Sequence, residues 1–359
     1  MSLVRLTDFA AIVCAPDTTV RRAMERMTET GNLFQVVADR TGRVLGTVTD
    51  GDVRRAILSG VAVEESIVRI MQREPVIGRI DRLDANRDLL EWLRRASPHA
   101  AFLPVVDESG TLREILAFAD VESEPPAALI MAGGLGRRLG ERTRDLPKPL
   151  LPVGGKPIVE RLIARLEETQ VRRVYIAVHY LADKIAEFAA GRPGIAELSI
   201  LREDEPLGTA GAIGRIDDLP AGGLLVLNGD VLTDVDYGAL VSFHRRNRHD
   251  GTVAVAQYQV DVPYGVVRHN DDGLFLGIQE KPCMHYFVAA GIYLLSPEFC
   301  ALVRPDQRLD MPDLMELGRG AGLRVGLFPI HEYWKDLGRP QDLETAERDL
   351  DRVANRERE

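Results

Sequence analysis

From Ala127 onward, the chain alternates short apolar runs with segments whose apolar residues recur at helical spacing. Short apolar runs bounded by polar turns predict buried strands, and the helical spacing predicts amphipathic helices. The expected strands are Ala127–Ala132, Val174–Val178, Leu198–Leu201 and Leu224–Leu227, and the expected helices are Lys156–Gln170, Ala182–Ala190, Tyr237–Arg246 and Asp342–Arg352. This alternation predicts an α/β fold with a Rossmann-like, mixed but mostly parallel sheet and helices on both faces.

The first 122 residues follow a different pattern, in which one half echoes the other. Gly31–Gly60 is typical of a strand, a turn, a strand and a helix, and Leu103–Ala119 repeats this order more weakly, about 70 positions later. The polar, proline-rich stretch Ser123–Pro126 predicts a joint. We therefore expect an α/β module over residues 1–122 and a separate domain over residues 127–359.

Candidate chemistry begins at Leu129–Pro157, where the first apolar run leads into a glycine-rich turn at Gly133–Gly136. Glycines let a backbone approach a ligand closely, and exposed N–H groups beside fixed cations suit a nucleoside triphosphate. A P-loop does not fit, because it needs Ser or Thr after its lysine, whereas Pro157 follows Lys156. A dinucleotide fingerprint does not fit either, because Leu139 stands where its third glycine belongs. Since ligands of such sheets bind beyond the carboxyl ends of the strands, the turn and Asp230 should face one crevice.

Composition limits the possible partners and compartments. The chain has 359 residues, 45% of them hydrophobic, and a formal net charge of −10. The negative charge argues against a general nucleic-acid binder, and no apolar run approaches the ~20 residues of a membrane span. Three scattered cysteines without metal-ligand spacing are typical of buried thiols. We expect a cytoplasmic protein without a signal peptide, in which a polyphosphate ligand needs a basic site and a divalent metal.

The stretch Leu129–Pro157, with its PKPLLP tail, resembles the signature of the sugar-1-phosphate nucleotidyltransferases. Further segments fit the same family in order, over about residues 127–350. They are LGTAGA at 207–212, NGD at 228–230, PYGVV at 263–267, EKP at 280–282 and YWKDLGRP at 333–340. The resemblance implies an enzyme that transfers a nucleoside monophosphate from an NTP to a sugar 1-phosphate and releases pyrophosphate.

That reaction explains the residue types. The attacking phosphate oxygen is already anionic, so in-line displacement at the α-phosphorus needs no general base, and catalysis rests on positioning and charge neutralisation. The resemblance assigns residues to three groups. The catalytic residues are Arg138, Lys148, Asp230, Lys281 and Asp336, the nucleotide-binding residues are Gly133, Gly134, Gly136, Gly208 and Thr209, and the sugar-binding residues are Tyr264, Gly265 and Glu280. Asp230 and Asp336 would share one Mg²⁺, a hard ion that prefers oxygen ligands.

The base and the sugar are less constrained. AGGLG with PKPLLPVGGKPI leans toward mannose-1-phosphate guanylyltransferases. A CBS-like pair ahead of such a domain, together with PYGVV and FPIHEYW, resembles guanylyltransferases of surface-sugar and nonulosonic (legionaminic-type) acid pathways, whose substrate is an amino sugar phosphate such as glucosamine 1-phosphate. GTP is favoured, and CTP, UTP and dTTP stay open. Arg137 and Ala289 replace the Thr and Asn that are common in the family, which leaves the sugar open. The alternative is a catalytically silent regulatory or scaffold relative. Such a relative is expected to have lost a catalytic Arg, Lys or Asp, whereas this chain keeps all five predicted catalytic residues.

The repeat in residues 1–122 resembles a tandem CBS pair, a module that often binds adenosine nucleotides. In that family, a Thr or Ser and an Asp three residues later hold phosphate and ribose. Thr49 and Asp52 match this pattern, whereas the second copy offers Ala117 and Asp120 and lacks the hydroxyl. The resemblance implies at most one adenosine or guanosine nucleotide site per chain. The alternative is a module used for dimerisation or as a spacer, and a homo-oligomer is expected.

Overall fold

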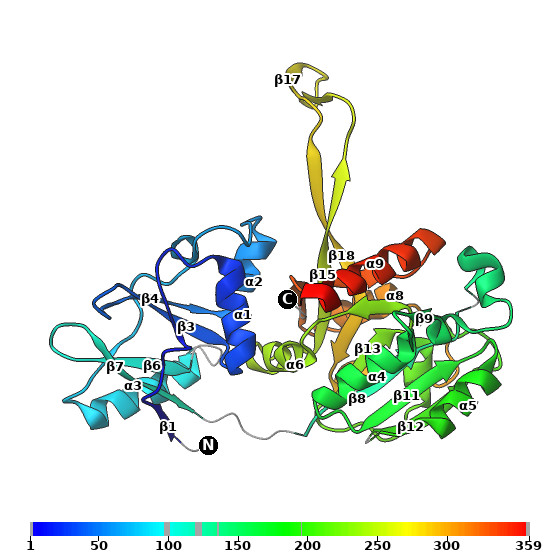
Figure 1. Cartoon of the computed structure of the whole chain (residues 1–359), viewed down its shortest axis with the longest axis horizontal. Coiled ribbons are helices and arrows are strands. Elements are labelled where there is room, and N and C mark those ends of the chain that lie inside the picture. Colours follow the sequence, from blue (N-terminus) through cyan, green and yellow to red (C-terminus); the bar gives the residue numbers. More distant parts are fainter. Residues whose placement is uncertain (1–2, 97–100, 119–123, 135, 195, 357–359) are drawn as a thin grey trace.

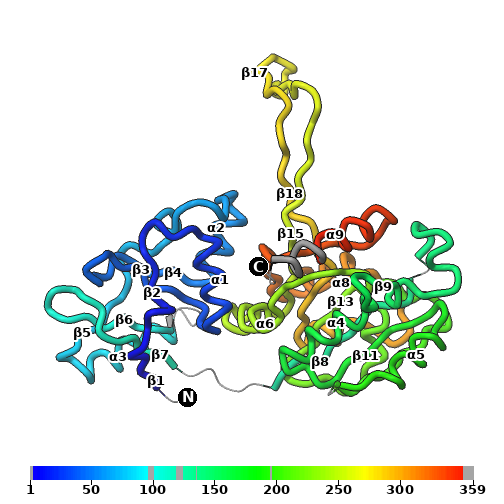
Figure 2. Tube along the Cα trace, in the orientation of Figure 1, coloured from blue at the N-terminus to red at the C-terminus, as the bar shows by residue number. Residues whose placement is uncertain are grey.

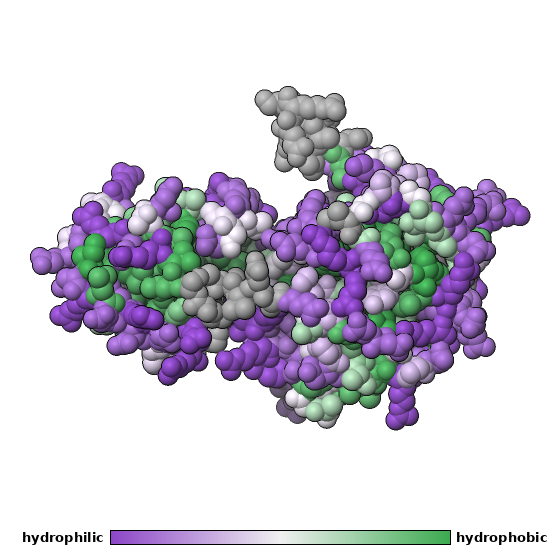
Figure 3. Space-filling view, turned by 90° about the horizontal axis from the view of Figure 1, so that it is seen from below, coloured by the Kyte–Doolittle hydropathy of each residue, from purple (hydrophilic) through white to green (hydrophobic). Residues whose placement is uncertain are grey.

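The computed structural model describes residues 3–96, 101–118, 124–134, 136–194 and 196–356. The chain forms an N-terminal module, a larger C-terminal domain and a hairpin that projects from that domain (Figure 1). The face of the two bodies in Figure 3 is mostly hydrophilic, with hydrophobic areas between the polar side chains. Within the described ranges, every helix is too short or too polar to cross a bilayer.

The N-terminal module contains the expected repeat. The first copy runs β2 (Val13–Cys14), α1 (Val20–Thr30), β3 (Phe34–Ala38), β4 (Val44–Thr49) and α2 (Asp50–Leu58); the second runs β5 (Gly78–Arg79), α3 (Leu83–Ala96), β6 (Phe102–Val106) and β7 (Leu112–Phe118). In each copy, a short strand pairs in parallel with the next strand, which then pairs antiparallel with its neighbour. The rings of Phe34 and Phe102 stack with centroids 3.8 Å apart, so the two copies share a core.

The second copy departs from the prediction at its end. The segment expected to be helical continues as β7, in which Ala117 pairs with Val4 of β1 (Leu3–Leu6) and with Phe102. Buried apolar residues cluster along this segment, Leu112, Ile115 and Leu116, and the sheet covers them. Asp120 lies outside the described residues.

The C-terminal domain is built on a seven-stranded sheet in the order β12-β11-β8-β13-β18-β15-β19. Its strands are β8 (Ala127–Met131), β11 (Arg173–Val178), β12 (Glu197–Arg202), β13 (Leu224–Asn228), β15 (Gly251–Asp261), β18 (Cys283–Leu295) and β19 (Val325–Ile330). The strands β12, β11, β8 and β13 are mutually parallel, whereas β18 runs antiparallel to β13 and β15. The predicted mixed, mostly parallel sheet is therefore confirmed.

Helices cover both faces of this sheet, as the alternating pattern predicts. One face packs against α4 (Ile158–Glu168), α5 (Ala182–Gly191), α6 (Tyr237–Arg246) and α9 (Pro340–Arg356). The other face packs against α7 (Pro297–Cys300), α8 (Met311–Gly320) and the short helix η5 (Gly211–Arg215). The apolar positions that predict α4 are its buried face, for example Leu162 and Ile163, because helical spacing places them on one side.

A two-stranded ribbon leaves the sheet on the antiparallel side. The inner halves of β15 and β18 are buried, but residues 257–287 are mostly exposed and extend away from both bodies (Figures 1 and 2). We call residues 257–287 the arm. Its outer part is the pair β16 (Val266–His269) and β17 (Phe275–Gln279). The apolar pattern of the sequence contains no separate signal for this projection.

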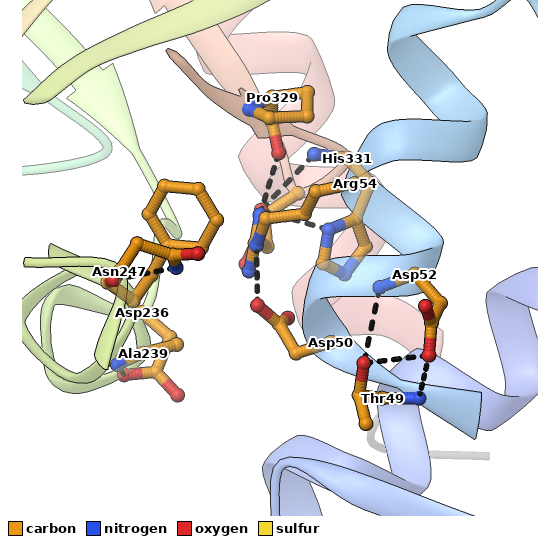
Figure 4. A network of polar contacts seen from close by, with 11 residues as sticks. Thr49, Asp50, Asp52, Arg54, Asp236, Ala239, Asn247, Pro329 and His331 are labelled. Atoms are coloured by element: carbon orange, nitrogen blue, oxygen red, sulfur yellow. Dashed lines mark hydrogen bonds and ion pairs between the residues drawn. The ribbon is translucent and has the colours of Figure 1, made fainter. Parts of the chain in front are cut away.

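The two bodies meet where α2 packs against β19. Arg54 of α2 is only 2% exposed. It donates to the Asp50 carboxylate at 2.7 Å and to the Pro329 carbonyl at 2.6 Å, and its guanidinium carbon lies 3.4 Å from the centroid of the Phe328 ring (Figure 4). A buried guanidinium with these partners fixes α2 against β19, the edge strand of the C-terminal sheet.

Candidate active site

The crevice lies where β8 and β13 end. Both strands run in the same direction, and the loops that follow them are held together, since the Gly229 N–H donates to the Met131 carbonyl at 2.9 Å. A cleft of about 280 Å³ opens at this edge. Its lining comprises Met131, Ala132, Gly133, Gly134, Lys148, Pro149, Glu203, Pro206, Gly208, Thr209, Asn228, Gly229 and Asp230. The structure thus brings most of the predicted nucleotide-binding glycines to one cleft with Lys148 and Asp230.

Glycine is present at two positions of the cleft for different structural reasons. A Cβ on Gly134 would meet no heavy atom within 4 Å, so this position leaves open space on the cleft side. Gly208 has φ of 81°, and a Cβ there would lie 2.5 Å from the Leu309 carbonyl oxygen. Gly208 is therefore required by the backbone itself, whereas Gly134 leaves room for a ligand.

Thr209 has a structural role that the motif did not suggest. Its hydroxyl accepts from the Met311 N–H at 2.7 Å, and its own N–H donates to Asp310 Oδ1 at 2.9 Å. These bonds tie the loop to the start of α8. Thr209 still borders the cleft, where it holds the loop that carries Gly208 in place.

Lys148 and Asp230 form an ion pair inside the cleft. Lys148 lies in a short helical turn, η4 (Lys148–Leu150), between Pro147 and Pro149, and its side chain is only 9% exposed. The Nζ atom donates to Asp230 Oδ2. Because the lysine is held by flanking prolines and nearly excluded from water, its charge has a fixed position at the end of the glycine-rich loop.

Asp336 joins this pair through a short sheet. β14 (Val231–Thr233) pairs antiparallel with β20 (Trp334–Asp336), with Val231 opposite Asp336. The Leu337 N–H also donates to the Asp230 carbonyl oxygen at 3.0 Å. Two aspartates more than a hundred positions apart in the sequence therefore lie side by side, as the sequence predicts for them.

The surroundings of Asp336 act on its charge. Partial removal from water raises the pKa of the Asp336 carboxyl, the nearby Asp230 carboxylate raises it further, and the cations Lys148 and Arg138 oppose both effects. Arg138 lies in the turn η3 (Arg137–Thr143), and a Cβ on Gly338 would lie 3.2 Å from its Nη1 atom. The site thus gathers two carboxylates and two cations.

The donor set fits a hard divalent cation that shares its coordination sphere with phosphate and water. Asp230 directly precedes β14 and Asp336 ends β20, so the short sheet brings their carboxylate oxygens to the same place. Among the described residues, no group of three or more His, Cys, Asp or Glu side chains is placed to hold a metal. A two-carboxylate site suits Mg²⁺, which keeps several ligands for substrate and water.

Glu203 lines the same cleft and was missed by the sequence analysis. The residue is 8% exposed, and its Oε1 atom is buried without a hydrogen-bond partner in the structure. Its other oxygen accepts weakly from the Leu207 N–H at 3.4 Å. Burial raises the pKa of the Glu203 carboxyl, while this N–H and the charges of Arg215 and His179 oppose the rise. The only signal in the sequence is its position four residues before LGTAGA.

The predicted sugar-binding residues do not line the cleft, and neither does Lys281, which was predicted to be catalytic and to grip the sugar phosphate. Tyr264, Gly265, Glu280 and Lys281 lie on the arm, which projects away from the cleft's own domain (Figure 2). They stay close to one another, because Val266 pairs with Gln279 and a Cβ on Gly265 would lie 2.9 Å from Glu280 Oε2. Within one chain, the structure therefore separates the nucleotide set from the sugar set.

Thr49 and Asp52 lie at the start of α2 in the N-terminal module. They form a capping box, in which Thr49 Oγ1 accepts from the Asp52 N–H at 3.2 Å and Asp52 Oδ2 accepts from the Thr49 N–H at 2.8 Å (Figure 4). Both also line a cleft of about 390 Å³ that is closed on the other side by the second copy, through Trp92, Leu93, Phe102 and Pro104. The capping box explains the pair structurally, and the cleft leaves room for a ligand beside it.

Comparison with known proteins identifies the family. A model of the nucleotidyl transferase family matches residues 127–352, and a model of the CBS domain matches residues 7–59. The chain therefore belongs to the nucleotidyl transferase family and carries an N-terminal CBS domain. The CBS match covers the first copy of the repeat and not the second.

Several curated relatives share one name within this family. The mannose-1-phosphate guanylyltransferase catalytic subunit beta of Danio rerio is 33% identical over 234 residues, which is 61% of this chain and 63% of the relative. The protein of the same name from Drosophila pseudoobscura pseudoobscura is 32% identical over 233 residues, 61% of each chain. The chain thus spans under two thirds of the length of these relatives.

A solved structure supports the fold. A protein from Bacillus anthracis, provisionally assigned as a glucose-1-phosphate thymidylyltransferase and solved with a sucrose, superposes with a TM-score of 0.50 at 23% identity. The match covers 62% of this chain and 94% of that one. At this level of identity, the similarity establishes the nucleotidyltransferase fold.

Proposed function

We propose that this protein transfers a nucleoside monophosphate, GMP in the first instance, from an NTP to a sugar 1-phosphate. The convergence of Lys148, Asp230, Asp336 and Arg138 beside a glycine-lined cleft carries the proposal. A catalytically silent relative would have no reason to keep two carboxylates and two cations together at the carboxyl ends of the strands.

The chemistry follows from the charges. An oxygen of the sugar phosphate attacks the α-phosphorus in line, the bond to the β-phosphate oxygen breaks, and pyrophosphate leaves. Lys148, released from Asp230, neutralises charge on the phosphates, and Arg138 holds the departing pyrophosphate. Asp230 and Asp336 would hold a Mg²⁺ ion, which supplies further charge neutralisation at the phosphates when bound. The backbone at Gly133 and Gly134 positions the triphosphate.

Glu203 supports the choice of GTP. Guanine presents two adjacent donors, the N1–H and the N2 amino group, and a carboxylate can accept from both. Glu203 Oε1 is buried without a hydrogen-bond partner, and the other oxygen, Oε2, lies next to Gly133, 3.4 Å from where a Cβ on that glycine would lie. Adenine presents an acceptor at N1 and would leave the carboxylate unsatisfied, which is costly in a buried site.

Two classes of sugar 1-phosphate are candidate substrates. The relatives are named for mannose 1-phosphate, whereas the CBS domain and the PYGVV and FPIHEYW segments favour an amino sugar phosphate of a surface-polysaccharide or nonulosonic (legionaminic-type) acid pathway. Both are anionic at the phosphate, so the discrimination must come from groups that contact the sugar ring.

One experiment tests the activity and both substrates. Purified protein is assayed for Mg²⁺-dependent pyrophosphate release with each of four NTPs against mannose, glucose, glucosamine and N-acetylglucosamine 1-phosphates. We expect release with GTP and one class of sugar, and formation of the matching GDP-sugar. Absence of release with every pair, from protein that binds GTP, would favour the silent relative instead.

A second function is proposed for the N-terminal module. We propose that an adenosine or guanosine nucleotide binds the cleft at Thr49 and Asp52, once per chain, and changes turnover. α2 begins at this cleft and also carries Arg54, which contacts Phe328 and Pro329 of the catalytic sheet (Figure 4). Calorimetry of ATP, AMP and GTP on the full chain and on Asp52→Ala tests it. If calorimetry detects no nucleotide site besides the catalytic one, the module is a dimerisation element or a spacer.

A further inference from the structure

We propose that the arm of one copy of this chain completes the sugar pocket of a second copy, so that each active site is assembled from two chains. The proposal rests on the proposed function, since it takes Tyr264, Glu280 and Lys281 to bind the sugar phosphate. What is new is the source of these residues, which is the partner and not the chain that holds the nucleotide.

The ribbon carries the sugar set out of reach of its own cleft. β15 and β18 stay paired in continuous register from Val255 opposite Ala289 to Asp261 opposite Cys283. At ~3.4 Å per residue, this ladder takes the sugar set roughly 15–20 Å beyond the sheet. No residue of the arm lines the nucleotide cleft. The two halves of the site therefore lie apart within one chain.

The arm is also too apolar to stand alone in water. Eleven of the eighteen large hydrophobic residues exposed in the described part of the chain belong to it. They are Tyr258, Val260, Tyr264, Val267, Leu274, Phe275, Leu276, Ile278, Met284, Tyr286 and Phe287. Tyr264 is 75% exposed and Phe275 is 65% exposed. An isolated two-stranded ribbon is marginal in water, and an apolar surface of this kind indicates a protein interface.

A second copy is the occupant that satisfies both halves. Folding back onto its own domain would break the ladder, because the one register shift along it, between Val253 and Val255, lies in the buried part of the sheet. The cleft of a second copy holds Lys148 and Asp230 beside Asp336, and it lacks the sugar-binding residues that the arm carries. Reciprocal exchange of arms gives a closed two-fold dimer, in which both sites are completed.

Mixed dimers test the proposal. Two chains with different affinity tags are co-expressed, one with Asp230→Asn and the other with Lys281→Ala, and the doubly tagged dimer is purified. At a sugar 1-phosphate concentration near the wild-type KM, each homodimer should lose most of its turnover. If arms are exchanged, the site with an intact cleft receives an intact arm, and the mixed dimer recovers about half of the wild-type turnover, since one of its two sites is complete.

The reciprocal pairing is the control. A chain with both Asp230→Asn and Lys281→Ala is paired with a wild-type chain. Exchange of arms predicts almost no activity, because the only intact cleft receives the damaged arm. An arm that serves its own chain predicts the opposite results, none in the first dimer and half in the second, and would overturn the proposal.

Three other results also decide the question. Failure to recover any doubly tagged dimer would show that the chain is monomeric, and wild-type turnover of the Lys281→Ala homodimer at that sugar 1-phosphate concentration would show that the arm does not serve the site. Either result overturns the proposal. An inactive wild-type protein would instead overturn the proposed function on which it rests.

Discussion

The cleft and the arm carry the two halves of one candidate site, yet they are built in opposite ways. In the cleft, Lys148 is nearly buried and ion-paired, and Asp336 is held beside Asp230 by a strand pair. On the arm, Tyr264 and Lys281 are exposed on a ribbon that projects from its own domain (Figure 1). The nucleotide half is therefore preorganised, and the sugar half needs a surface to pack against.

The largest effect should come from breaking the cleft and leaving the arm intact. Asp230→Asn removes the charge that pairs with Lys148 and one of the two carboxylates. We expect turnover to fall on the order of 100-fold, a typical cost for one group that stabilises transition-state charge. Asp217→Asn, an exposed aspartate of the same domain, is the matched control and should keep wild-type turnover. Equal activity of the two variants would remove Asp230 from the site.

Lys148→Arg tests how tightly the cleft fixes its cation. The charge is kept, but the larger planar fork cannot occupy the place of a point charge held between two prolines. We expect turnover to fall at least ~10-fold, or about 1.4 kcal/mol of transition-state stabilisation. Initial rates at saturating substrates and an unchanged melting temperature would check this. Near wild-type turnover would show that any cation serves at this position.

Glu203→Gln sharpens the comparison, because it should change the selectivity for the base of the NTP and leave the binding of the sugar 1-phosphate unchanged. The amide keeps the shape but replaces one acceptor by a donor that faces the donors of guanine. We expect kcat/KM for GTP relative to ATP to fall about 10-fold, within the ~1–3 kcal/mol of a bidentate base contact. The KM for the sugar 1-phosphate should stay unchanged. An unaltered GTP preference would place base selection elsewhere.

The raised pKa of Glu203 predicts a pH dependence with a definite sign. The ionised form accepts both guanine donors, so GTP affinity should be complete above this pKa and should fall as the pH is lowered through it. Titration of GTP and ITP into wild type and Glu203→Gln at several pH values checks this. In the wild type, the ratio of GTP affinity to ITP affinity should decrease as the pH is lowered. A ratio that stays constant with pH would contradict the assignment.

The smallest effect concerns the module and its contact with the sheet. Arg54→Met removes the donors to Asp50 and Pro329 but keeps a long apolar side chain beside Phe328. We expect basal turnover to change less than in the cleft variants, and any response of turnover to a nucleotide at the module to be lost. The coupling should be about 1–3 kcal/mol in the wild type. A response that survives in Arg54→Met would remove α2 as the connection.

The sequence predicted the regular parts of the fold well, because their signals are local. The helical spacing at Ile158, Leu162 and Ile163 and the apolar run at Leu224–Leu227 each identify one buried face, and the structure contains both elements. The helix predicted at the end of the second repeat was wrong. The spacing of Leu112, Ile115 and Leu116 is compatible with a helix, and only the pairing with β6 and β1 makes this segment a strand.

The site was predicted unevenly for a similar reason. The expectation that Asp230 and Asp336 share one ion came from the family resemblance, and the pairing of β14 with β20 brings the two residues together. Glu203 was missed because a single acidic residue in the segment REDEP carries no pattern of its own, and its importance comes from burial. The exposure of Tyr264 and Glu280 could not be predicted either, because the length of the ribbon depends on pairing that no local pattern reveals.

The division of labour between cleft and arm is tested most directly by the steady-state constants of Lys281→Ala for both substrates. Lys281 lies on the arm, away from the cleft residues that we propose to hold the nucleotide. The account predicts that the KM for the sugar 1-phosphate rises at least ~10-fold, as expected when a charge-assisted contact is lost, while the KM for GTP stays close to its wild-type value. A KM for GTP that rises as much, or a KM for the sugar 1-phosphate that does not change, would contradict it.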